Sequence, residues 1–271
     1  MEKFSVAMCV YGGDNAEHFK IAVDSIVNQT AKPSEVVLVV DGPVPDNLNT
    51  VICDYEQFSE FTVIRLPQNM GHGIARRTGI ESCSNELVAL MDADDVSVGN
   101  RFEKQLKVFE DDNELSIVGG NIEEFIDSLD NIVGRRIVPL DDVAIKDYMQ
   151  YRCPMNQMTV MFKKIDILKV GGYQDWYCDE DYYLWLRMAL AKMKFANVQD
   201  ILVKVRVGKD MYQRRGGWKY FKSEFALQRY MLENKIIGFG TFVMNSVKRL
   251  IVQVLLPNQL RGWVFRKFAR G

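Results

Sequence analysis

The sequence is poor in the residues that build histidine metal centres and nucleophilic triads. Only two of its 271 residues are histidine, His18 and His72, and they lie far apart. This scarcity argues against a histidine-rich zinc site and leaves few candidates for a Ser-His-Asp triad. The five cysteines are odd in number, widely spaced and form no Cys-x-x-Cys pair. That usage indicates a reducing compartment rather than a disulfide framework.

Long apolar runs and phosphate-binding glycine motifs are also missing. The apolar run near the N-terminus is short and is broken at Gly12-Gly13, which argues against a secretory signal and favours a cytoplasmic protein. No Gly-x-x-x-x-Gly-Lys-Ser/Thr motif occurs, and Gly71-x-Gly73 lacks the third glycine of a dinucleotide fingerprint. P-loop and Rossmann dinucleotide sites are therefore not expected.

The net charge is −2, which predicts no nucleic-acid partner, but the charge is unevenly distributed. Apolar residues make up 48% of the chain and charged residues 26%, which is sufficient for a packed core. Residues 204–271 hold fifteen basic and three acidic side chains, a net of +12, so residues 1–203 carry −14. A basic tail on an acidic body predicts contact with an anionic surface.

Short apolar runs alternate with helix-period segments in the first half of the chain. Asp14 and Glu17 have the spacing of a capping box, and apolar residues three and four positions apart follow them. Further helices are predicted at 46–58 and 73–83. The alternation predicts an α/β fold with a right-handed, mostly parallel sheet covered on both faces. Four runs have the length and composition of buried strands: 4–10, 35–40, 61–66 and 86–91.

The second half has a different pattern and is predicted to be α+β, packed against the same sheet. A helix is expected to begin near Asp179, and the stretch 205–217 mixes glycine with basic residues, which predicts a mobile loop. We therefore expect a first domain over 1–205, followed by a basic loop and an amphipathic helical region over 206–271. Three further strand candidates lie in this half: 117–126, 132–139 and 157–162.

Asp92, Asp94 and Asp95 follow directly after the fourth predicted strand. In extended backbone, residues two apart project to one side, so Asp92 and Asp94 can reach a common point. Ligands bind beyond the carboxyl ends of strands in open α/β sheets, and a 3-2-1-4 strand order would bring Tyr11 and Asp41 to the same crevice. Carboxylate oxygens fit Mg²⁺ or Mn²⁺, which take further ligands from substrate phosphates. The alternative is that these acids form turns or cap the next helix.

Six motifs follow one another along the chain. They are SVAMCVYGGD (5–14), SIVNQTAKPSEVVLVVDG (25–42), QNMGHGIARRTGI (68–80), LVALMDADD (87–95), GGYQDW (171–176) and EDYYLWLR (180–187). In this order and spacing they resemble family 2 glycosyltransferases of the GT-A fold and of the bacterial capsule or O-antigen type. The similarity extends over roughly residues 3–206. It implies a doubly wound mixed sheet flanked by helices, with a helical C-terminal appendage.

The resemblance implies a single inverting displacement at the anomeric carbon of a nucleotide-diphospho-sugar. Asp94, the last acid of the Asp-x-Asp motif, would ligate Mn²⁺ or Mg²⁺ at the donor diphosphate, and Asp92 would support the ion or the donor ribose. Asp41 resembles an aspartate that accepts from the N3–H of uracil or thymine, which implies a UDP- or dTDP-sugar donor. Arg76 stands where the family has an arginine that can bind phosphate. Tyr11 would line the same nucleotide-sugar site.

Three positions depart from the family pattern. Val40 stands where many relatives carry a first aspartate, and Pro43 stands where they carry serine, which weakens the expected contacts to the base. Arg77 occupies a position where asparagine is usual. A turn before Gly42-Pro43 is the alternative explanation for Asp41.

Asp179, Glu180 and Asp181 precede a segment with a helical apolar face. The helix macrodipole favours acids in a first turn, so their spacing alone requires no function. The resemblance implies instead that Asp181 is the base that removes the acceptor hydroxyl proton, with Glu180 beside it to bind the acceptor. A helix N-terminus lowers a carboxylate pKa and neighbouring carboxylates raise it, and a useful base requires the second effect to prevail at least in part.

The basic loop at 213–218 is close to the Gln-x-x-Arg-Trp motif of processive synthases without matching it. Gly216 and Gly217 stand where arginine and tryptophan would be needed. We therefore expect one sugar to be transferred per encounter, with Arg214 or Arg215 closing over the diphosphate. A solvated basic loop is the alternative.

The tail carries an apolar helical face that we expect to lie on an anionic membrane surface. Lys248 and Arg249 lie off this face and argue against a membrane-spanning helix. Trp263 and the basic residues around it are typical of a bilayer interface. The alternative is a helix packed on the body with a solvated basic face. The apolar face consists of Phe239, Phe242, Val243, Val247, Leu250, Ile251, Val254 and Leu255.

These observations predict an inverting, metal-dependent glycosyltransferase that is peripheral on the inner face of the cell membrane. Its acceptor would be a glycan or a polyprenyl-diphosphate-linked sugar in surface polysaccharide synthesis. One alternative is a sugar nucleotidyltransferase, although the loop after the first strand, Tyr11 to Asp14, is acidic rather than rich in Arg and Lys. The other is a non-catalytic scaffold that binds nucleotide sugar in a polysaccharide assembly complex.

Overall fold

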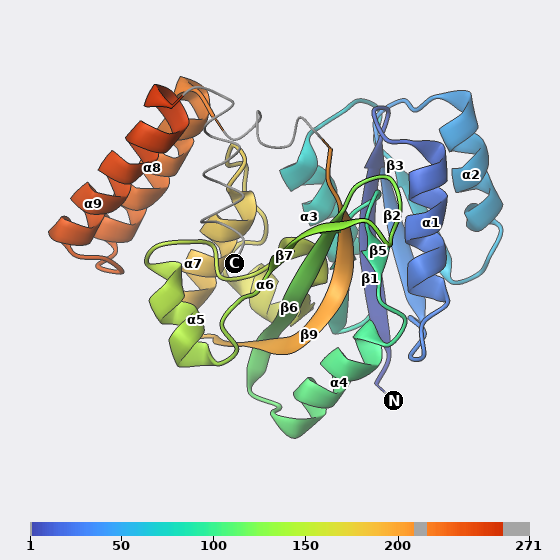
Figure 1. Ribbon diagram of the computed structural model, residues 1–271. Coiled ribbons are helices and arrows are strands. Elements are labelled where there is room, and N and C mark those ends of the chain that lie inside the picture. Colours follow the sequence, from blue (N-terminus) through green and yellow to red (C-terminus); the bar gives the residue numbers. More distant parts are fainter. Residues whose placement is uncertain (1, 209–215, 257–271) are drawn as a thin grey trace.

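A computed structural model describes residues 2–208 and 216–256 of the chain (Figure 1). Its strands pair into one mixed sheet. They are β1 (Phe4–Tyr11), β2 (Glu35–Asp41), β3 (Phe61–Arg65), β4 (Leu87–Met91), β5 (Val96–Ser97), β6 (Leu115–Phe125), β7 (Ile132–Arg136), β8 (Met161–Lys163) and β9 (Lys194–Arg206).

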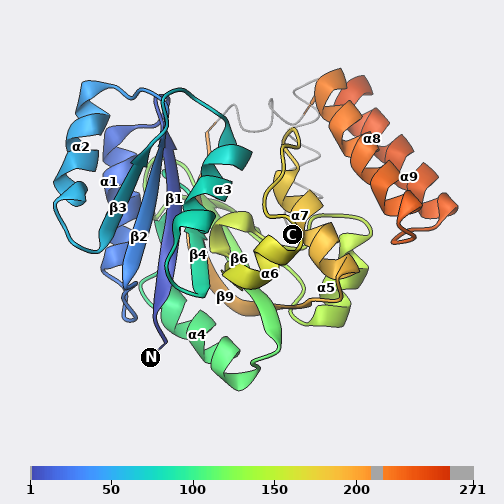
Figure 2. The same ribbon diagram turned by 180° about the vertical axis from the view of Figure 1, so that it is seen from behind.

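Helices cover the sheet on both faces, as the two opposite views show (Figures 1 and 2). They are α1 (Ala16–Val27), α2 (Asp46–Glu56), α3 (His72–Ser82), α4 (Arg101–Asp111), α5 (Asp142–Met149), α6 (Lys164–Lys169), α7 (Glu180–Leu190), α8 (Trp218–Glu233) and α9 (Phe239–Leu250). Two short turns complete the described elements: the 3₁₀ turn η1 (Gln157–Thr159) and the π-helical turn η2 (Ile251–Leu255).

The strand order confirms the arrangement predicted for the first half. The order is β3-β2-β1-β4-β8-β6-β9-β5, with β7 paired to β6 outside this path. Strands β1 to β4 pair in parallel, whereas β8 is antiparallel to both β4 and β6. The predicted pair at 117–126 and 132–139 is β6 antiparallel to β7. The expected fold class, a mixed α/β sheet flanked by helices with further C-terminal helices, is confirmed.

Alternate side chains of the central strands enter two different hydrophobic cores. Val6, Met8 and Val10 of β1 pack in the core that α1, α2 and α4 share. Ala7 faces the opposite core, to which α3, α5, α6, α7 and α8 contribute. Because parallel strands buried on both faces have no solvent-facing positions, they read in the sequence as continuous apolar runs.

Two local predictions are wrong. The predicted strand at 157–162 begins instead as η1, because the Thr159 amide and hydroxyl both donate to the Asn156 carbonyl oxygen. The predicted capping box at Asp14 is replaced by Asn15, whose Oδ1 accepts from the amides of Glu17 and His18 at 2.9 and 3.1 Å. Asp14 turns back, and its Oδ2 accepts from the Tyr11 amide at 2.9 Å.

Helices α8 and α9 form a hairpin beside α7, on the side of the body away from α1 and α2 (Figures 1 and 2). Leu227 and Met231 of α8 are buried in the same core as Trp185 of α7. The last long strand, β9, ends at Arg206, next to the proposed boundary, but the division into two domains stays a prediction. Among the described residues, we find no helix with the length and hydropathy needed to span a bilayer.

The cap of α1 gives a direct test of local stability. We expect Asn15→Ala to lower the free energy of unfolding by about 1 kcal/mol, because two amides at the helix start lose their acceptor. The midpoint of thermal unfolding should fall by about 2–4 °C. Asn113→Ala, at an exposed turn position, is the matched control and should leave the midpoint unchanged. An equal shift in both variants would contradict the assigned cap.

Candidate active site

The carboxyl ends of the parallel strands bring the predicted donor-site residues together, at the edge of the sheet farthest from the N-terminus (Figure 1). Tyr11 and Asp41 are register partners at the ends of β1 and β2. Met8 of β1 pairs with Met91, the residue before Asp92. The structure thus places Tyr11, Asp41 and Asp92 along one edge, as the 3-2-1-4 order predicts.

The acids after β4 have different environments. Burial and the neighbouring charges of Asp92 and Asp14 raise the pKa of Asp94 to about 6. Asp95 is buried, and its Oδ1 accepts from the Arg206 amide at 2.9 Å, which ties β9 to this edge of the sheet. Burial and the charge of Asp94 raise the pKa of Asp95 well above its usual value. Asp95 is therefore structural, and Asp92 and Asp94 are the carboxylates available to a ligand.

Arg76, on α3, joins the two acidic motifs. Its guanidinium donates to Asp92 Oδ1 at 2.9 Å and to Glu180 Oε1 at 2.8 Å. The Arg76 side chain is only 10% exposed, and the two carboxylates hold its pKa above the usual range despite its burial. One buried cation therefore connects the strand end that carries Asp92 with the first turn of α7. The predicted phosphate contact of Arg76 stays a prediction.

Asp41 anchors the loop before α3. Its Oδ1 accepts from the Met70 amide at 2.6 Å, and its Oδ2 accepts from the Gly71 amide at 3.0 Å. Gly71 has φ +88°, a backbone conformation that side chains with a Cβ rarely adopt. Each carboxylate oxygen has a second lone pair, so the expected contact with a nucleobase stays a prediction. Tyr11 is 39% exposed, and the centroid of its ring lies 6.3 Å from that of His72.

The candidate base lies at the start of α7. Burial, followed by the charge of Glu180, raises the pKa of Asp181 to about 6, although the Tyr182 amide donates to its Oδ1 at 2.6 Å. The raising effects therefore prevail, as a base requires. Their main cause, burial, is a tertiary effect that the spacing of the acids did not indicate.

Two residues near Asp181 were missed by the sequence analysis. The Cys153 thiol lies 3.8 Å from Asp181 Oδ2, and the charge of Arg136 lowers the pKa of Asp181. Arg136 donates to the Cys153 carbonyl oxygen at 2.6 Å. Both belong to segments that the sequence presents as strand or loop, with no motif to mark them.

A second buried cation lies behind β4. Arg101 is fully buried, and its guanidinium donates to the Leu90 carbonyl oxygen at 2.9 Å and to Gln105 Oε1 at 3.0 Å. Burial lowers the pKa of Arg101 to about 9, while the charges of Asp92 and Asp95 oppose that shift. Arg101 thus supports the strand end from which the Asp-x-Asp motif projects. In the sequence it is one arginine in an amphipathic helix.

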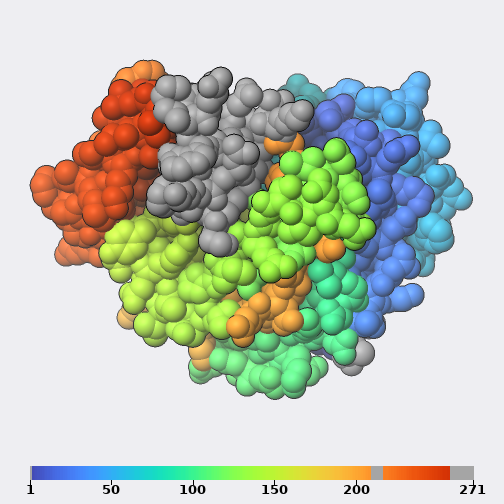
Figure 3. All heavy atoms as spheres, in the orientation of Figure 1, coloured from blue at the N-terminus to red at the C-terminus, as the bar shows by residue number. Residues whose placement is uncertain are grey.

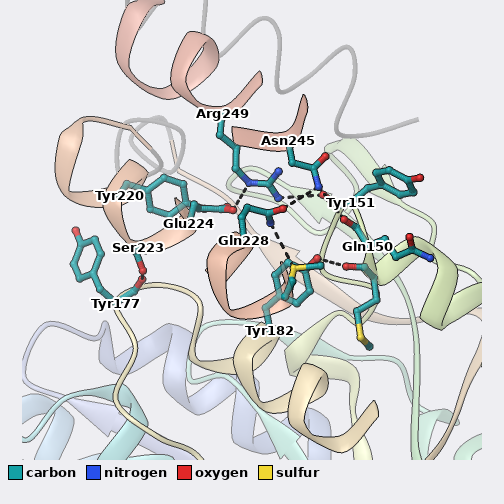
Figure 4. A network of polar contacts seen from close by, with 12 residues as sticks. Gln150, Tyr151, Tyr177, Tyr182, Tyr220, Ser223, Glu224, Gln228, Asn245 and Arg249 are labelled. Atoms are coloured by element: carbon teal, nitrogen blue, oxygen red, sulfur yellow. Dashed lines mark hydrogen bonds and ion pairs between the residues drawn. The ribbon is translucent and has the colours of Figure 1, made fainter. Parts of the chain in front are cut away.

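The C-terminal hairpin contacts the segment that leads into α7 (Figure 4). Ser223 of α8 donates to the Tyr177 carbonyl oxygen at 2.6 Å, in the loop that precedes α7. Burial and the charge of Glu224 raise the pKa of Asp179 well above its usual value. The environment of Asp179, the N-cap residue of α7, therefore depends on α8. Arg214 and Arg215, predicted to close over the diphosphate, lie outside the described residues.

The carboxylates fit a divalent cation that shares its ligands with a substrate. Within residues 2–208 and 216–256, no group of three or more His, Cys, Asp or Glu residues is arranged to hold a metal by itself. Mg²⁺ and Mn²⁺ bind through one or two carboxylates plus substrate phosphates. The charges of Asp92 and Asp14 act on Asp94 and help to raise its pKa, so these carboxylates lie close enough to affect one another. Asp94 and Asp92 are thus suitable as a partial ligand set.

Comparison with known proteins decides the family. The model of the family described as "Glycosyl transferase family 2" matches residues 5–168. The chain belongs to glycosyl transferase family 2. This membership confirms the prediction that the protein is an enzyme of the glycosyltransferase class. It disfavours the two alternatives, a nucleotidyltransferase and a non-catalytic scaffold.

Two relatives of this glycosyltransferase are bacterial proteins named as glycosyltransferases. The chain is 35% identical over 268 residues to an Escherichia coli UDP-Gal:alpha-D-GlcNAc-diphosphoundecaprenol beta-1,3-galactosyltransferase, covering 99% of this chain and 97% of the relative. It is 34% identical over 272 residues to the amylovoran biosynthesis glycosyltransferase AmsE of Erwinia amylovora, covering 99% and 100%. The crystal structure of S. aureus TarS 1-349 with UDP-GlcNAc has the same fold, with a TM-score of 0.66 and 14% identity, over 97% of this chain and 79% of that one.

The bridge through Arg76 should stabilise this glycosyltransferase in a pH-dependent way. We expect Arg76→Gln to lower the free energy of unfolding at neutral pH by about 3 kcal/mol, because Asp92 and Glu180 lose the cation between them. The charge of Arg76 also lowers the raised pKa of Asp181, so without Arg76 the folded protein retains a proton on Asp181 to a higher pH. The loss should therefore be smaller at pH 5 than at pH 7.5 in urea-unfolding titrations.

Arg77→Gln is the matched control for this measurement. Arg77 is the next residue of α3, is 54% exposed and pairs with Glu81 one helical turn away. Its replacement should change stability by about 0.5 kcal/mol or less at either pH. If the two variants lose the same stability, or if the loss in Arg76→Gln is independent of pH, the bridge does not stabilise the site as described.

Proposed function

We propose that this glycosyltransferase moves a single sugar from a UDP-sugar to a polyprenyl-diphosphate-linked acceptor sugar, with inversion at the anomeric carbon. The observation that carries the proposal is the Arg76 bridge, which brings Asp92 of the Asp-x-Asp motif and the Glu180-Asp181 pair to one site. A donor held at the first motif then lies next to a base at the second. The reaction would take place at the cytoplasmic face of the membrane, as part of surface polysaccharide synthesis.

The relatives support this choice of donor and acceptor. The name of the Escherichia coli relative specifies UDP-galactose as donor and a GlcNAc-diphosphoundecaprenol acceptor. AmsE is named for its part in synthesis of the polysaccharide amylovoran. Of the UDP- and dTDP-sugars that the sequence allowed, we therefore favour UDP-sugars, and of glycans and lipid-linked sugars we favour the lipid-linked class.

In the proposed reaction, Asp181 accepts the proton of the acceptor hydroxyl as its oxygen forms a bond to the anomeric carbon. The bond between that carbon and the donor diphosphate oxygen breaks on the opposite side, and the nucleoside diphosphate leaves. The pKa of about 6 leaves Asp181 largely ionised at pH 7 while keeping it basic enough to accept a proton. Glu180, fixed by Arg76, would orient the acceptor sugar.

The leaving diphosphate carries the negative charge that develops in this step. Asp94, with Asp92, would hold a Mn²⁺ or Mg²⁺ ion, which when bound offsets that charge. Arg76 already lies against Asp92, so a diphosphate oxygen near that carboxylate would be within reach of the guanidinium. Tyr11 and Asp41, at the ends of β1 and β2, would line the nucleotide end of the site.

Replacement of the base should separate binding from chemistry. We expect Asp181→Asn to reduce sugar transfer at least about 100-fold while donor affinity changes by less than about two-fold, because the amide cannot accept the proton. Transfer by the unsubstituted protein should fall as the pH is lowered through about 6, where Asp181 becomes protonated. Rates measured with a UDP-sugar and a short-chain diphosphate-linked acceptor test both points. Asp111→Asn, an exposed change, is the control, and near-normal transfer by Asp181→Asn would remove the assignment.

Replacement of the metal-side acid should have the opposite signature. We expect Asp94→Asn to weaken Mn²⁺-dependent donor binding at least about ten-fold, because one of two carboxylate ligands is lost. Titration calorimetry with UDP-sugars, with and without Mn²⁺, measures this, and parallel titrations with dTDP- and GDP-sugars identify the nucleotide. If the unsubstituted protein binds the donor with the same affinity with and without Mn²⁺, the proposed metal dependence is excluded. If Asp94→Asn binds the donor as tightly as the unsubstituted protein in the presence of Mn²⁺, Asp94 is not a ligand of the metal ion.

A further inference from the structure

An ordinary surface helix packs its apolar side on the body and turns its polar side to solvent. Helix α9 does the reverse. Its polar residues Asn245 and Ser246, together with Gln253 of η2, are buried. The apolar residues of the opposite side are exposed: Phe239 by 71%, Val243 by 41%, Val247 by 48%, Ile251 by 45% and Leu255 by 66%. In the space-filling view this helix lies at the outer edge of the molecule (Figure 3). The predicted apolar face is therefore present, but most of it faces away from the body.

Polar contacts with the body fix this orientation (Figure 4). Asn245 Nδ2 donates to the Gln150 carbonyl oxygen and to Gln228 Oε1, at 2.9 Å each. Arg249 forms an ion pair with Glu224, in which both side chains are less than 15% exposed. A rotation of α9 that buried its apolar side would break these contacts. Glu224 would then be left buried without its ion-pair partner Arg249. The apolar side therefore has to face outward.

An aromatic row on α8 continues this apolar side. Successive ring centroids lie 5.9 Å apart from Trp218 to Phe221, 5.9 Å from Phe221 to Phe225, 5.5 Å from Phe225 to Phe242 and 6.3 Å from Phe242 to Phe239. Trp218 is 61% exposed and Phe225 is 38% exposed. We call the aromatic row and the exposed apolar residues of α9 and η2 the outer hairpin face. Contiguous exposed apolar surface of this kind marks an interaction site.

The charge around the outer hairpin face is of one sign. The two acids of 218–256 are both paired, Glu224 with Arg249 and Glu233 with Arg229. Lys219, Lys222, Lys235 and Lys248 are exposed, and none of them forms an ion pair with a described residue. The chain after residue 256 adds four basic residues, one tryptophan and no acid. A partner of opposite charge is therefore favoured.

We propose that the outer hairpin face docks on an anionic phospholipid bilayer, with the apolar side chains in the interfacial region and the lysines on lipid headgroups. Aromatic and aliphatic side chains flanked by lysine are the composition of helices that lie in a bilayer interface. The inner side of the same hairpin contacts the loop before α7 through Ser223, and the charge of Glu224 acts on Asp179, the N-cap residue of α7. Docking would thus hold the acceptor side of the site close to the membrane.

A second copy of the chain is a less suitable occupant. A symmetric dimer through this face would bring the same unpaired lysines of two subunits together, which is unfavourable without intervening anions. The choice of a bilayer rests in part on the lipid-linked acceptor proposed above. Vesicle binding without acceptor and transfer to a short-chain acceptor in solution separate the two proposals, because either can fail without the other.

The test is co-sedimentation of the full chain with vesicles of phosphatidylcholine alone and with about 30% phosphatidylglycerol. We expect binding to the anionic vesicles, weakened by salt, and little binding to the neutral ones. The triple variant Phe239→Gln, Val243→Gln, Val247→Gln should bind at least ten-fold more weakly. Its transfer to a short-chain acceptor should match that of the unsubstituted protein, which shows that it is folded.

A matched triple variant elsewhere controls for loss of exposed apolar side chains. Phe58, Val143 and Ile165 are 54%, 70% and 63% exposed, and their replacement by Gln should leave vesicle binding unchanged. The proposal is overturned if the unsubstituted protein does not bind anionic vesicles at low salt, or if the two triple variants bind these vesicles equally. A dimer in solution that the α9 triple variant converts to a monomer would assign the face to self-association instead.

Discussion

The site depends on one buried cation held between two acidic segments. Arg76 contacts Asp92 and Glu180, which lie 88 positions apart in the sequence and belong to different halves of the fold. Without a cation at this point, carboxylates from β4 and α7 would repel each other across a poorly solvated space. Arg76 therefore allows the fold to keep the carboxylates of these two segments close together. Arg101 serves the same purpose from behind β4, where it has no access to solvent.

The same principle explains why the acids differ in character. Asp95 is bound by the backbone of β9 and Asp41 by the backbone of the loop before α3, so both fix structure. Asp94 and Asp181 each lie near other carboxylates, and desolvation together with those charges raises the pKa of each to about 6. Carboxylates with raised pKa values are typical of functional centres. Since all four residues are aspartates, their different contacts and pKa values come from their surroundings.

The C-terminal hairpin connects this centre to the outside of the molecule. Its buried polar side adjusts the surroundings of α7 through Ser223 and Glu224, while its exposed side is apolar and flanked by lysine. Both roles require the unusual orientation of α9, in which a polar network faces inward (Figure 4). The sequence already indicated that this region is basic, in contrast to the acidic residues 1–203.

The sequence by itself determined the parallel half of the sheet, because buried strands require continuous apolar runs and their order follows from the connections. It also determined the candidate acids through motifs in series and the apolar face of α9 through its periodicity. Only the tertiary structure decided which helix residue caps α1, that Asp95 and Asp41 bind backbone amides, and that Arg101, Arg136 and Cys153 surround the site. It also decided that the apolar face of α9 points outward. Periodicity records which residues share a face, but the direction of that face is fixed by contacts such as Asn245 with Gln150, which are distant in sequence.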